Sequence, residues 1–143
     1  TQHKGKAMKV AIFALLLPIM AAAATEREIV AATLILEAGG EYHIGSMEAV
    51  HEVIQNRAKS RRQTLSEVCL SRWQFSCWNG VSVDSGIAKA KRHPRWDRAM
   101  AIVGTVTNYT HGADHYHADY VTPWWAKHMT RTAVIGRHIF YRS

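Results

Sequence analysis

An apolar run between Thr25 and Ala38 sets the frame of this chain, because it carries clear start and stop signals for a helix. Thr25 and Glu28 are the first and fourth residues of a capping box, in which each side chain bonds the backbone of the other. Gly39-Gly40 follows the run and ends it. The sequence therefore predicts a helix over 25–38, then a glycine turn, then a second helix.

Glu37 lies in the last turn of this predicted helix, on the face shared by Val30, Thr33 and Leu34. The helix dipole and partial burial both disfavour a negative charge there. A carboxyl that keeps its proton near neutral pH can act as a general acid. The alternative is an ordinary solvated residue at a helix end, as most glutamates are.

The second helix is predicted to begin at Ser46 as its cap and to end near Asn56-Arg57. Apolar residues recur on one face at spacings of three and four, and the other face is expected to be polar. Thr64 and Glu67 form a second capping box, which predicts a short helix over 65–70. Pro94 opens a further helix, expected to run to about Gly112.

The segment 72–80 is the most aromatic part of the chain. Aromatic faces separated by amide and hydroxyl groups suit a sugar-binding cleft, because pyranose rings have apolar faces and polar edges. Gln74 and Phe75 are candidate substrate-binding residues on this ground. For Trp73 and Trp78 a place in the core is an equal alternative.

Residues 114–121 and 132–141 are rich in aromatic and β-branched residues and predict a small antiparallel sheet near the C-terminus. Strand alternation places Tyr116 on one face and His115 and His117 on the other. Tyr116, His117 and the loop residue Trp124 are further candidates for contact with substrate. The predicted class is α+β and helix-dominated.

Residues 1–24 are predicted to be a leader, with a secretory signal peptide that starts at Met8. An apolar run, 10–20, and the small residues 22–24 match that pattern, and a retained membrane anchor is the competing interpretation.

The formal net charge is +7, and it falls to +4 without the three lysines of the leader. This charge suits an anionic cell wall, nucleic acid or simple solubility, so it does not rank them. In an exported protein Cys69 and Cys77 could form a disulfide.

The order of several short motifs resembles the SleB-like cell-wall hydrolases, the spore-cortex lytic enzyme type. EAGGE at 37–41, Gly45 and Asn56-Arg57 are similar to the family's E-A/S-R-G-E, G and N-R elements. Downstream, QFS at 74–76, GADHYH at 112–117 and IGRHIF at 135–140 take the places of Q-F-S, G-A-L-Y-Y-Y and I-G-K-H-V-F. Gly39 stands where the family usually has Arg, and two histidines replace tyrosines.

This resemblance implies a lysozyme-like fold over residues 25–143 that cleaves the glycan strand of peptidoglycan, with Glu37 as the catalytic acid. The expected reaction is that of a lytic transglycosylase at the β-1,4 bond after N-acetylmuramic acid. It needs no cofactor and no metal. The family pattern also suggests that Asn56 and Arg57 brace the active-site turn, and Glu41 is a further candidate contact with substrate.

Two other classes of function stay open. His111, His115, His117 and His128 could bind zinc in an amidase or endopeptidase of the same wall, although no HExxH motif is present. A non-catalytic wall-binding module would need the aromatic residues and the charge but no acid. The expected protein is an exported monomer that acts on peptidoglycan, binds no nucleic acid, and touches the membrane only if the leader is retained.

Overall fold

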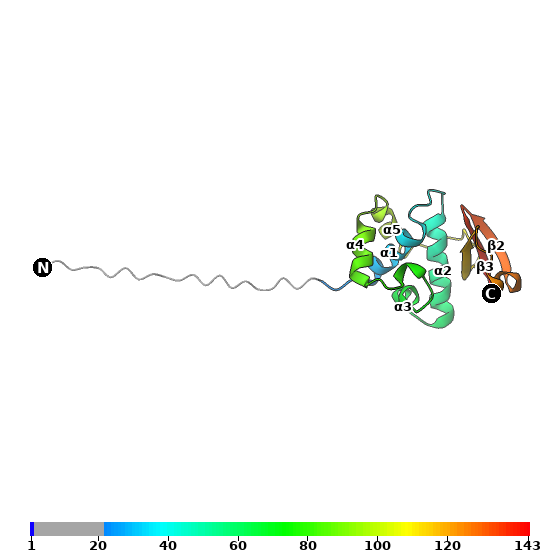
Figure 1. The fold of residues 1–143 in the computed structure, drawn as a ribbon, viewed down its shortest axis with the longest axis horizontal. Helices are drawn as coiled ribbons and strands as arrows, with labels where there is room; N and C mark the ends of the chain where they lie inside the picture. The colour runs from blue at the N-terminus through cyan, green and yellow to red at the C-terminus, as the bar shows by residue number, and fades with distance from the viewer. Residues whose placement is uncertain (2–21) are drawn as a thin grey trace.

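The computed structural model describes residue 1 and residues 22–143, so most of the predicted leader lies outside the described residues. The described chain has five α-helices followed by a three-stranded sheet near the C-terminus (Figure 1). This confirms the predicted helix-dominated α+β class. Within residues 22–143 no helix has the length and apolar character that crossing a membrane requires.

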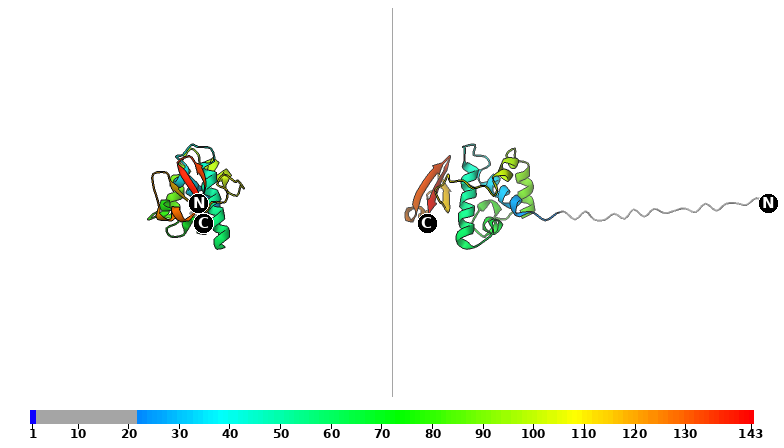
Figure 2. Two further views of the ribbon diagram at one scale, coloured as in Figure 1. Left: turned by 90° about the vertical axis from the view of Figure 1, so that its right-hand side faces the viewer. Right: turned by 180° about the vertical axis from the view of Figure 1, so that it is seen from behind.

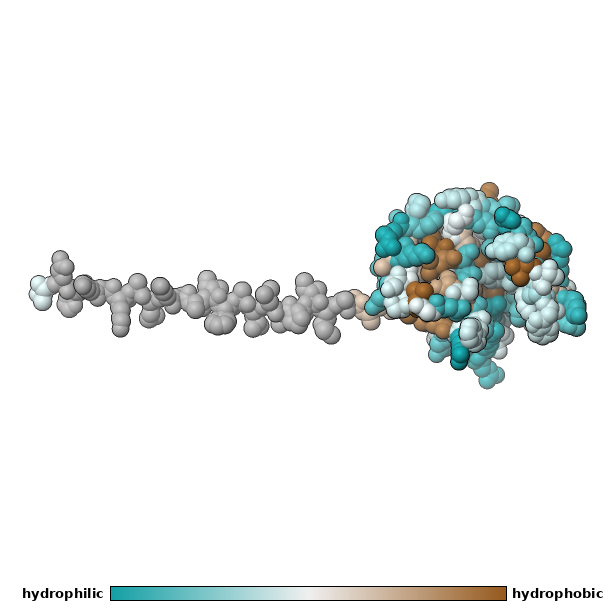
Figure 3. All heavy atoms as spheres, in the orientation of Figure 1, coloured by the Kyte–Doolittle hydropathy of each residue, from teal (hydrophilic) through white to brown (hydrophobic). Residues whose placement is uncertain are grey.

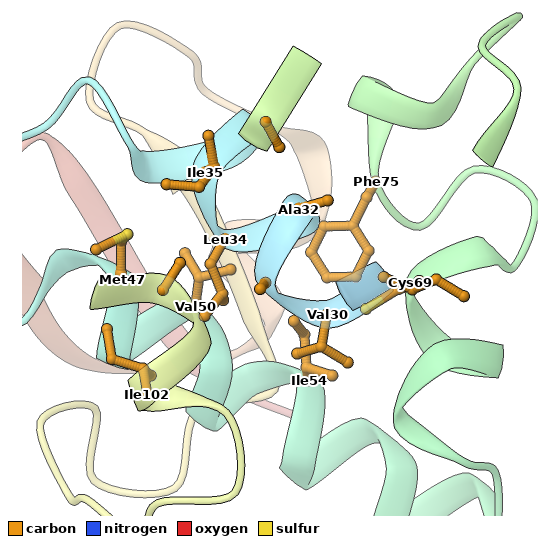
Figure 4. Packing of buried hydrophobic residues seen from close by; sticks show 14 of the residues in the cluster. Val30, Ala32, Leu34, Ile35, Met47, Val50, Ile54, Cys69, Phe75 and Ile102 are labelled. Atoms are coloured by element: carbon orange, nitrogen blue, oxygen red, sulfur yellow. The ribbon is translucent and has the colours of Figure 1, made fainter. Parts of the chain in front are cut away.

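Helix α1, Glu26–Ala38, is the centre of the helical part. Its predicted capping box is confirmed, because Thr25 Oγ1 accepts from the Glu28 backbone N–H (3.1 Å) and Glu28 Oε1 accepts from the Thr25 N–H (3.2 Å). Val30 and Leu34 are fully buried, and residues of α2, α3 and α5 surround them (Figure 4). A helix whose middle is enclosed in this way is fixed by packing more than by its own helix propensity.

Helix α2, Ser46–Arg61, lies between the other helices and the sheet in both side views (Figures 1 and 2). Met47, Val50 and Ile54 pack in the α1 core, whereas Ala49 and Val53 pack in a second cluster with the sheet. The second face is polar in composition, as predicted, but much of it is buried and does not face solvent. The list of buried polar residues on α2 is Ser46, Glu48, His51, Glu52 and Arg57.

The start of α2 also differs from the prediction. Ser46 is the first helical residue and does not cap the helix, and the cap position is Gly45 with φ +88°. A Cβ atom at Gly45 would lie 2.8 Å from the ring of Tyr109. Glycine is therefore required here both by the backbone conformation and by the close ring.

Three short helices complete the helical part: α3, Leu65–Leu70, α4, Val83–Lys91, and α5, Trp96–Ile102. The Thr64 and Glu67 capping box of α3 is confirmed. Helix α5 ends at Ile102, earlier than the predicted end near Gly112, and Gly104 follows with φ +87°. The residues after it form an irregular loop that donates hydrogen bonds to the Glu52 side chain.

The sheet contains β1, His115–Ala118, β2, Thr130–Ile135, and β3, His138–Arg142, in the antiparallel order β1-β3-β2. Two short 3-10 helices, η1 at Ser76–Trp78 and η2 at Trp124–His128, lie in the connections. Tyr116 is paired with Phe140 of the central strand. The surface seen in Figure 3 is mostly hydrophilic, with hydrophobic residues gathered in a few patches.

Candidate active site

Glu37 meets the sheet at the end of α1. The Tyr116 hydroxyl of β1 donates a hydrogen bond to Oε2 of Glu37 (2.8 Å). Burial raises the pKa of Tyr116 well above its ordinary value, and the Glu37 carboxylate raises it further. The phenol therefore stays protonated and acts as a hydrogen-bond donor at all physiological pH values.

The Tyr116 ring is held by two neighbours from β3. It stacks on Phe140 with ring centroids 5.5 Å apart and meets the edge of His138 at 5.2 Å. The start of β1 is fixed from α2, because Asn56 Nδ2 donates to the Ala113 carbonyl and Arg57 Nε donates to the Asp114 carbonyl, both at 2.7 Å. Asn56 and Arg57 thus hold the segment that presents Tyr116.

Two hollows flank the contact between Glu37 and Tyr116. The first, which Tyr116 lines, is about 500 Å³ in volume, and we call it the aromatic hollow. Its lining residues are Arg57, Arg61, Trp73, Gln74, His115, Tyr116, Trp124, Trp125 and Met129. Trp73 and Trp124 are 72% and 77% exposed. The Trp73 backbone has φ +65°, a strained conformation for a large residue, which is more common at functional sites than elsewhere.

Polar groups of the aromatic hollow are held in place by neighbours. Arg61 Nη1 donates to Oε1 of Gln74 (2.6 Å), which leaves the Gln74 amide N–H groups for another acceptor. Arg57 is only 8% exposed and lies over the Phe75 ring, 5.3 Å from its centroid. The hollow therefore combines exposed indole faces with fixed hydrogen-bond donors, as a sugar site requires.

The second hollow, of about 320 Å³, contains Glu37 itself, and we call it the acid hollow. Its other lining residues are Leu36, Ser76, Cys77, Val81, Gly86 and Lys89. Tyr116 lines the aromatic hollow and donates its hydroxyl to Glu37 of the acid hollow, so this hydrogen bond links the two hollows. Trp78 is structural, because its Nε1 donates to Thr33 Oγ1 (3.0 Å) and its ring leaves no room for a Cβ atom at Gly86.

The two cysteines are free thiols, so the predicted disulfide is not formed in this structure. Cys69 is buried in the α1 core, and burial raises the pKa of its thiol to about 12. Burial also raises the pKa of the Cys77 thiol, and the nearby Glu37 carboxylate raises it further. Both thiols therefore stay protonated at neutral pH.

Three of the predicted substrate contacts do not line these hollows. Phe75 is only 3% exposed and belongs to the core, where it supports Arg57. His117 lies on the opposite face of β1 from Tyr116, stacked on Tyr141 with its Nε2 3.0 Å from the Tyr141 hydroxyl. Strand alternation predicted this separation, but His117 also meets the edge of Trp125 (5.7 Å), which lines the aromatic hollow, so its contact with substrate stays a prediction.

Glu41 is the third. Its Oε1 accepts from the Arg137 backbone N–H in the turn between β2 and β3, and its Oε2 lies 3.0 Å from His138 Nδ1. That separation suits an ion pair with a protonated imidazole, but the groups are not aligned for a hydrogen bond. Glu41 therefore fixes the turn that carries His138 against Tyr116.

Gln74, Tyr116 and Trp124 do lie together around the aromatic hollow. Arg57 joins them without having been predicted as a contact with substrate, and so does Trp73, for which the sequence left the cleft and the core equally open. Trp73 stands next to Gln74 in the sequence. It is exposed and has a positive φ, which the local sequence does not predict. In the described part of the chain, no three His, Cys, Asp or Glu side chains are grouped so as to hold a metal ion.

Comparison with known proteins places this chain in a family. The model of the family described as Cell Wall Hydrolase matches residues 40–141, which is most of the chain and begins just after Glu37. The chain belongs to the cell wall hydrolase family. The predicted relationship is confirmed, and the protein is accordingly a hydrolase of the cell wall.

Two solved structures share the fold of this cell wall hydrolase. The catalytic domain of the germination-specific lytic transglycosylase SleB from Bacillus anthracis has a TM-score of 0.65 and 23% identity, over 82% of this chain and 93% of that one. The catalytic domain of the Bacillus cereus SleB protein has a TM-score of 0.52 and 22% identity, over 82% and 91%. Among curated proteins, none matches the chain.

Proposed function

We propose that this cell wall hydrolase is a lytic transglycosylase, which cleaves the β-1,4 bond between N-acetylmuramic acid and N-acetylglucosamine in peptidoglycan. The observation that carries the proposal is the place of Glu37, a half-buried carboxyl that lines the acid hollow and is hydrogen-bonded to Tyr116 of the aromatic hollow. The SleB neighbour of the same fold is itself described as a lytic transglycosylase.

In this proposal Glu37 acts first as an acid. Its proton passes to the glycosidic oxygen, the bond from that oxygen to C1 of the muramic residue breaks, and the N-acetylglucosamine part leaves as an alcohol. The resulting carboxylate then takes the proton of the muramic C6 hydroxyl, whose oxygen bonds to C1 and closes a 1,6-anhydro ring. Glu37 is protonated again at the end, so one carboxyl serves both steps.

Tyr116 supports this sequence because it can donate but cannot easily lose its proton. Its hydrogen bond to Oε2 holds the carboxyl in one orientation, and it strengthens whenever Glu37 carries a charge. The second oxygen can then transfer the proton in both steps. Arg57 is buried and always charged. It makes no hydrogen bond to Glu37, but its charge attracts the Glu37 carboxylate through space.

The position of Glu41 favours the single-acid route. A hydrolysis with two carboxylates requires a partner acid across the scissile bond. Glu41 is the nearest acid in sequence, but the turn at Arg137 and His138 engages both of its oxygens. We therefore assign it a positioning role and no part in proton transfer.

The proposed setting is outside the cell membrane, where the exposed Trp73 and Trp124 would stack on successive sugar rings. The protein would act as a monomer and without a cofactor. The leader, whose cleavage is part of the same proposal, would deliver it to the wall.

The test is the class of fragment released from purified peptidoglycan, separated by chromatography with and without a chelator. We expect soluble fragments that carry sugar, in equal amounts under both conditions. Sugar-free peptides, lost with the chelator and restored by zinc, would instead support an amidase or endopeptidase. A protein that stays bound to the wall and releases nothing would be a binding module.

A further inference from the structure

A third hollow of about 450 Å³ adjoins the acid hollow, and we call it the basic hollow. Its lining residues are Ile35, Leu36, Gly40, Lys89, Arg92, His93 and Pro94. Leu36 and Lys89 line both hollows, so the basic hollow continues the groove that contains Glu37 on the side away from the sheet.

The walls of the basic hollow are apolar at the base and cationic at the rim. Ile35 is buried, Leu36 is half-buried, and Lys89 and Arg92 are exposed. Among residues 22–143 neither cation forms an ion pair, whereas Lys91 of the same helix is paired with Glu28 (2.5 Å). No acidic residue lines this hollow.

His93 adds a hydrogen-bond donor to this lining. Its Nδ1 accepts a hydrogen bond from the Arg95 backbone N–H (3.1 Å), which places the ring proton of the neutral imidazole on Nε2. Arg95 in turn donates to the carbonyls of Gly39 (3.2 Å) and Glu41 (2.7 Å), on either side of Gly40. The turn at Gly40 is thereby tied to the segment that follows α4.

From this geometry we infer that the basic hollow binds the peptide stem of peptidoglycan, with the stem carboxylates on Lys89 and Arg92 and its aliphatic part on Ile35 and Leu36. The inference rests on the proposed function, because the stem is attached to the muramic residue that the groove would hold. An apolar floor with unpaired cations at its edge matches a short aliphatic peptide with free carboxylates better than it matches an uncharged sugar.

The test compares two forms of the same soluble glycan strands, one with intact peptide stems and one from which an amidase has removed them. Binding is measured with Glu37→Gln protein, so the result does not depend on whether the parent cleaves the strands. The variant adds Lys89→Gln and Arg92→Gln. The matched control adds Lys59→Gln and Arg131→Gln, which removes two exposed charges that lie outside the basic hollow and form no ion pair within the described part of the chain.

We expect the Lys89 and Arg92 variant to bind stem-bearing strands about five- to tenfold more weakly, since exposed charge pairs are each worth only a few-fold. Its affinity for stripped strands should match that of the control. An equal loss on both kinds of strand would overturn the inference in favour of general attraction to the glycan, as would no loss on either. Failure of the proposed function would show separately, as absence of sugar-bearing fragments with the parent protein.

Discussion

Two glutamates in this protein, Glu37 and Glu52, stand on neighbouring helices and are used in opposite ways. Glu52 of α2 is 4% exposed and accepts four hydrogen bonds. The donors are the hydroxyls of Thr107 and Thr110 and the backbone N–H groups of Tyr109 and Thr110, at 2.9–3.0 Å. Glu37 instead lines an open hollow and receives a hydrogen bond from Tyr116.

The difference shows how to separate a structural acid from a reactive one. A carboxylate with both oxygens saturated by neutral donors has no free position for a substrate, and it fixes whatever supplies those donors. Glu52 thereby holds the loop after α5 against α2. Glu37 keeps room for a further partner beside a hollow, which is what proton transfer needs.

The largest expected effect is the loss of activity in Glu37→Gln. Removing the proton donor while keeping the shape should slow fragment release by about 10²- to 10⁴-fold. The free energy of unfolding, measured by urea denaturation, should stay within about 0.5 kcal/mol of the parent. Activity within a few-fold of the parent would remove Glu37 from the mechanism.

Glu52→Gln should give the opposite result. The amide NH₂ would face two donors, so the buried site would lose two charge-assisted hydrogen bonds and leave donors unsatisfied, at a cost of about 2–4 kcal/mol. Urea denaturation measures the loss, and fragment release is scaled to the amount of folded protein. A stable Glu52→Gln protein with abolished activity would reverse the roles assigned to the two acids.

Tyr116→Phe should reduce fragment release about tenfold, because it removes a hydrogen bond to a group that becomes charged during the reaction. The ring stack on Phe140 is kept, so the fold should be unaffected. Tyr141→Phe is the matched control, since its hydroxyl bonds His117 on the other face of the sheet. Equal losses in the two variants would mean that the Tyr116 hydroxyl has no special role.

The smallest expected effect is a pH dependence of stability that originates beside Glu52. Burial lowers the pKa of His51, although Glu52 and Glu48 oppose the shift. The unfolded imidazole then binds a proton more readily than the folded one. Its contribution to stability is complete above the unfolded value of about 6.5 and decreases as the pH falls below it, by about 1 kcal/mol per pH unit until the folded pKa is reached.

His51→Gln should therefore reduce the slope of unfolding free energy between about pH 6.5 and 5.5. The substituted amide can still accept from the Gly104 N–H, which now bonds His51 Nε2 at 3.3 Å. Urea denaturation at several pH values measures the slope. An unchanged slope would show that His51 does not control it.

The elements specified by local signals were predictable from the sequence. The capping boxes at Thr25 and Thr64 and the alternation around Tyr116 involve residues close in the chain, and the structure confirms all three. The end of α5 and the buried acids of α2 were not predictable in this way. The Glu52 carboxylate bonds residues more than fifty positions away, and only the folded chain brings them together.

The candidate site shows the same division between features set by local sequence and features set by tertiary contacts. Gln74 and Phe75 are adjacent and were both candidate contacts, yet one lines the aromatic hollow and the other is buried. Phe75 directly precedes η1, and its ring lies under the Arg57 guanidinium. Which of the two side chains is buried therefore depends on contacts with a residue distant in the sequence. Trp73 was ambiguous for the same reason, since its exposure follows from a backbone conformation set by tertiary packing.

The most direct test of the account is the mass of the muramic end on fragments that the protein releases from purified peptidoglycan. A single carboxyl acting first as acid and then as base predicts 1,6-anhydromuramic ends, lighter by one water than the hydrolysed form. Hydrated reducing ends on fresh products would contradict this route and require a second carboxylate across the bond from Glu37.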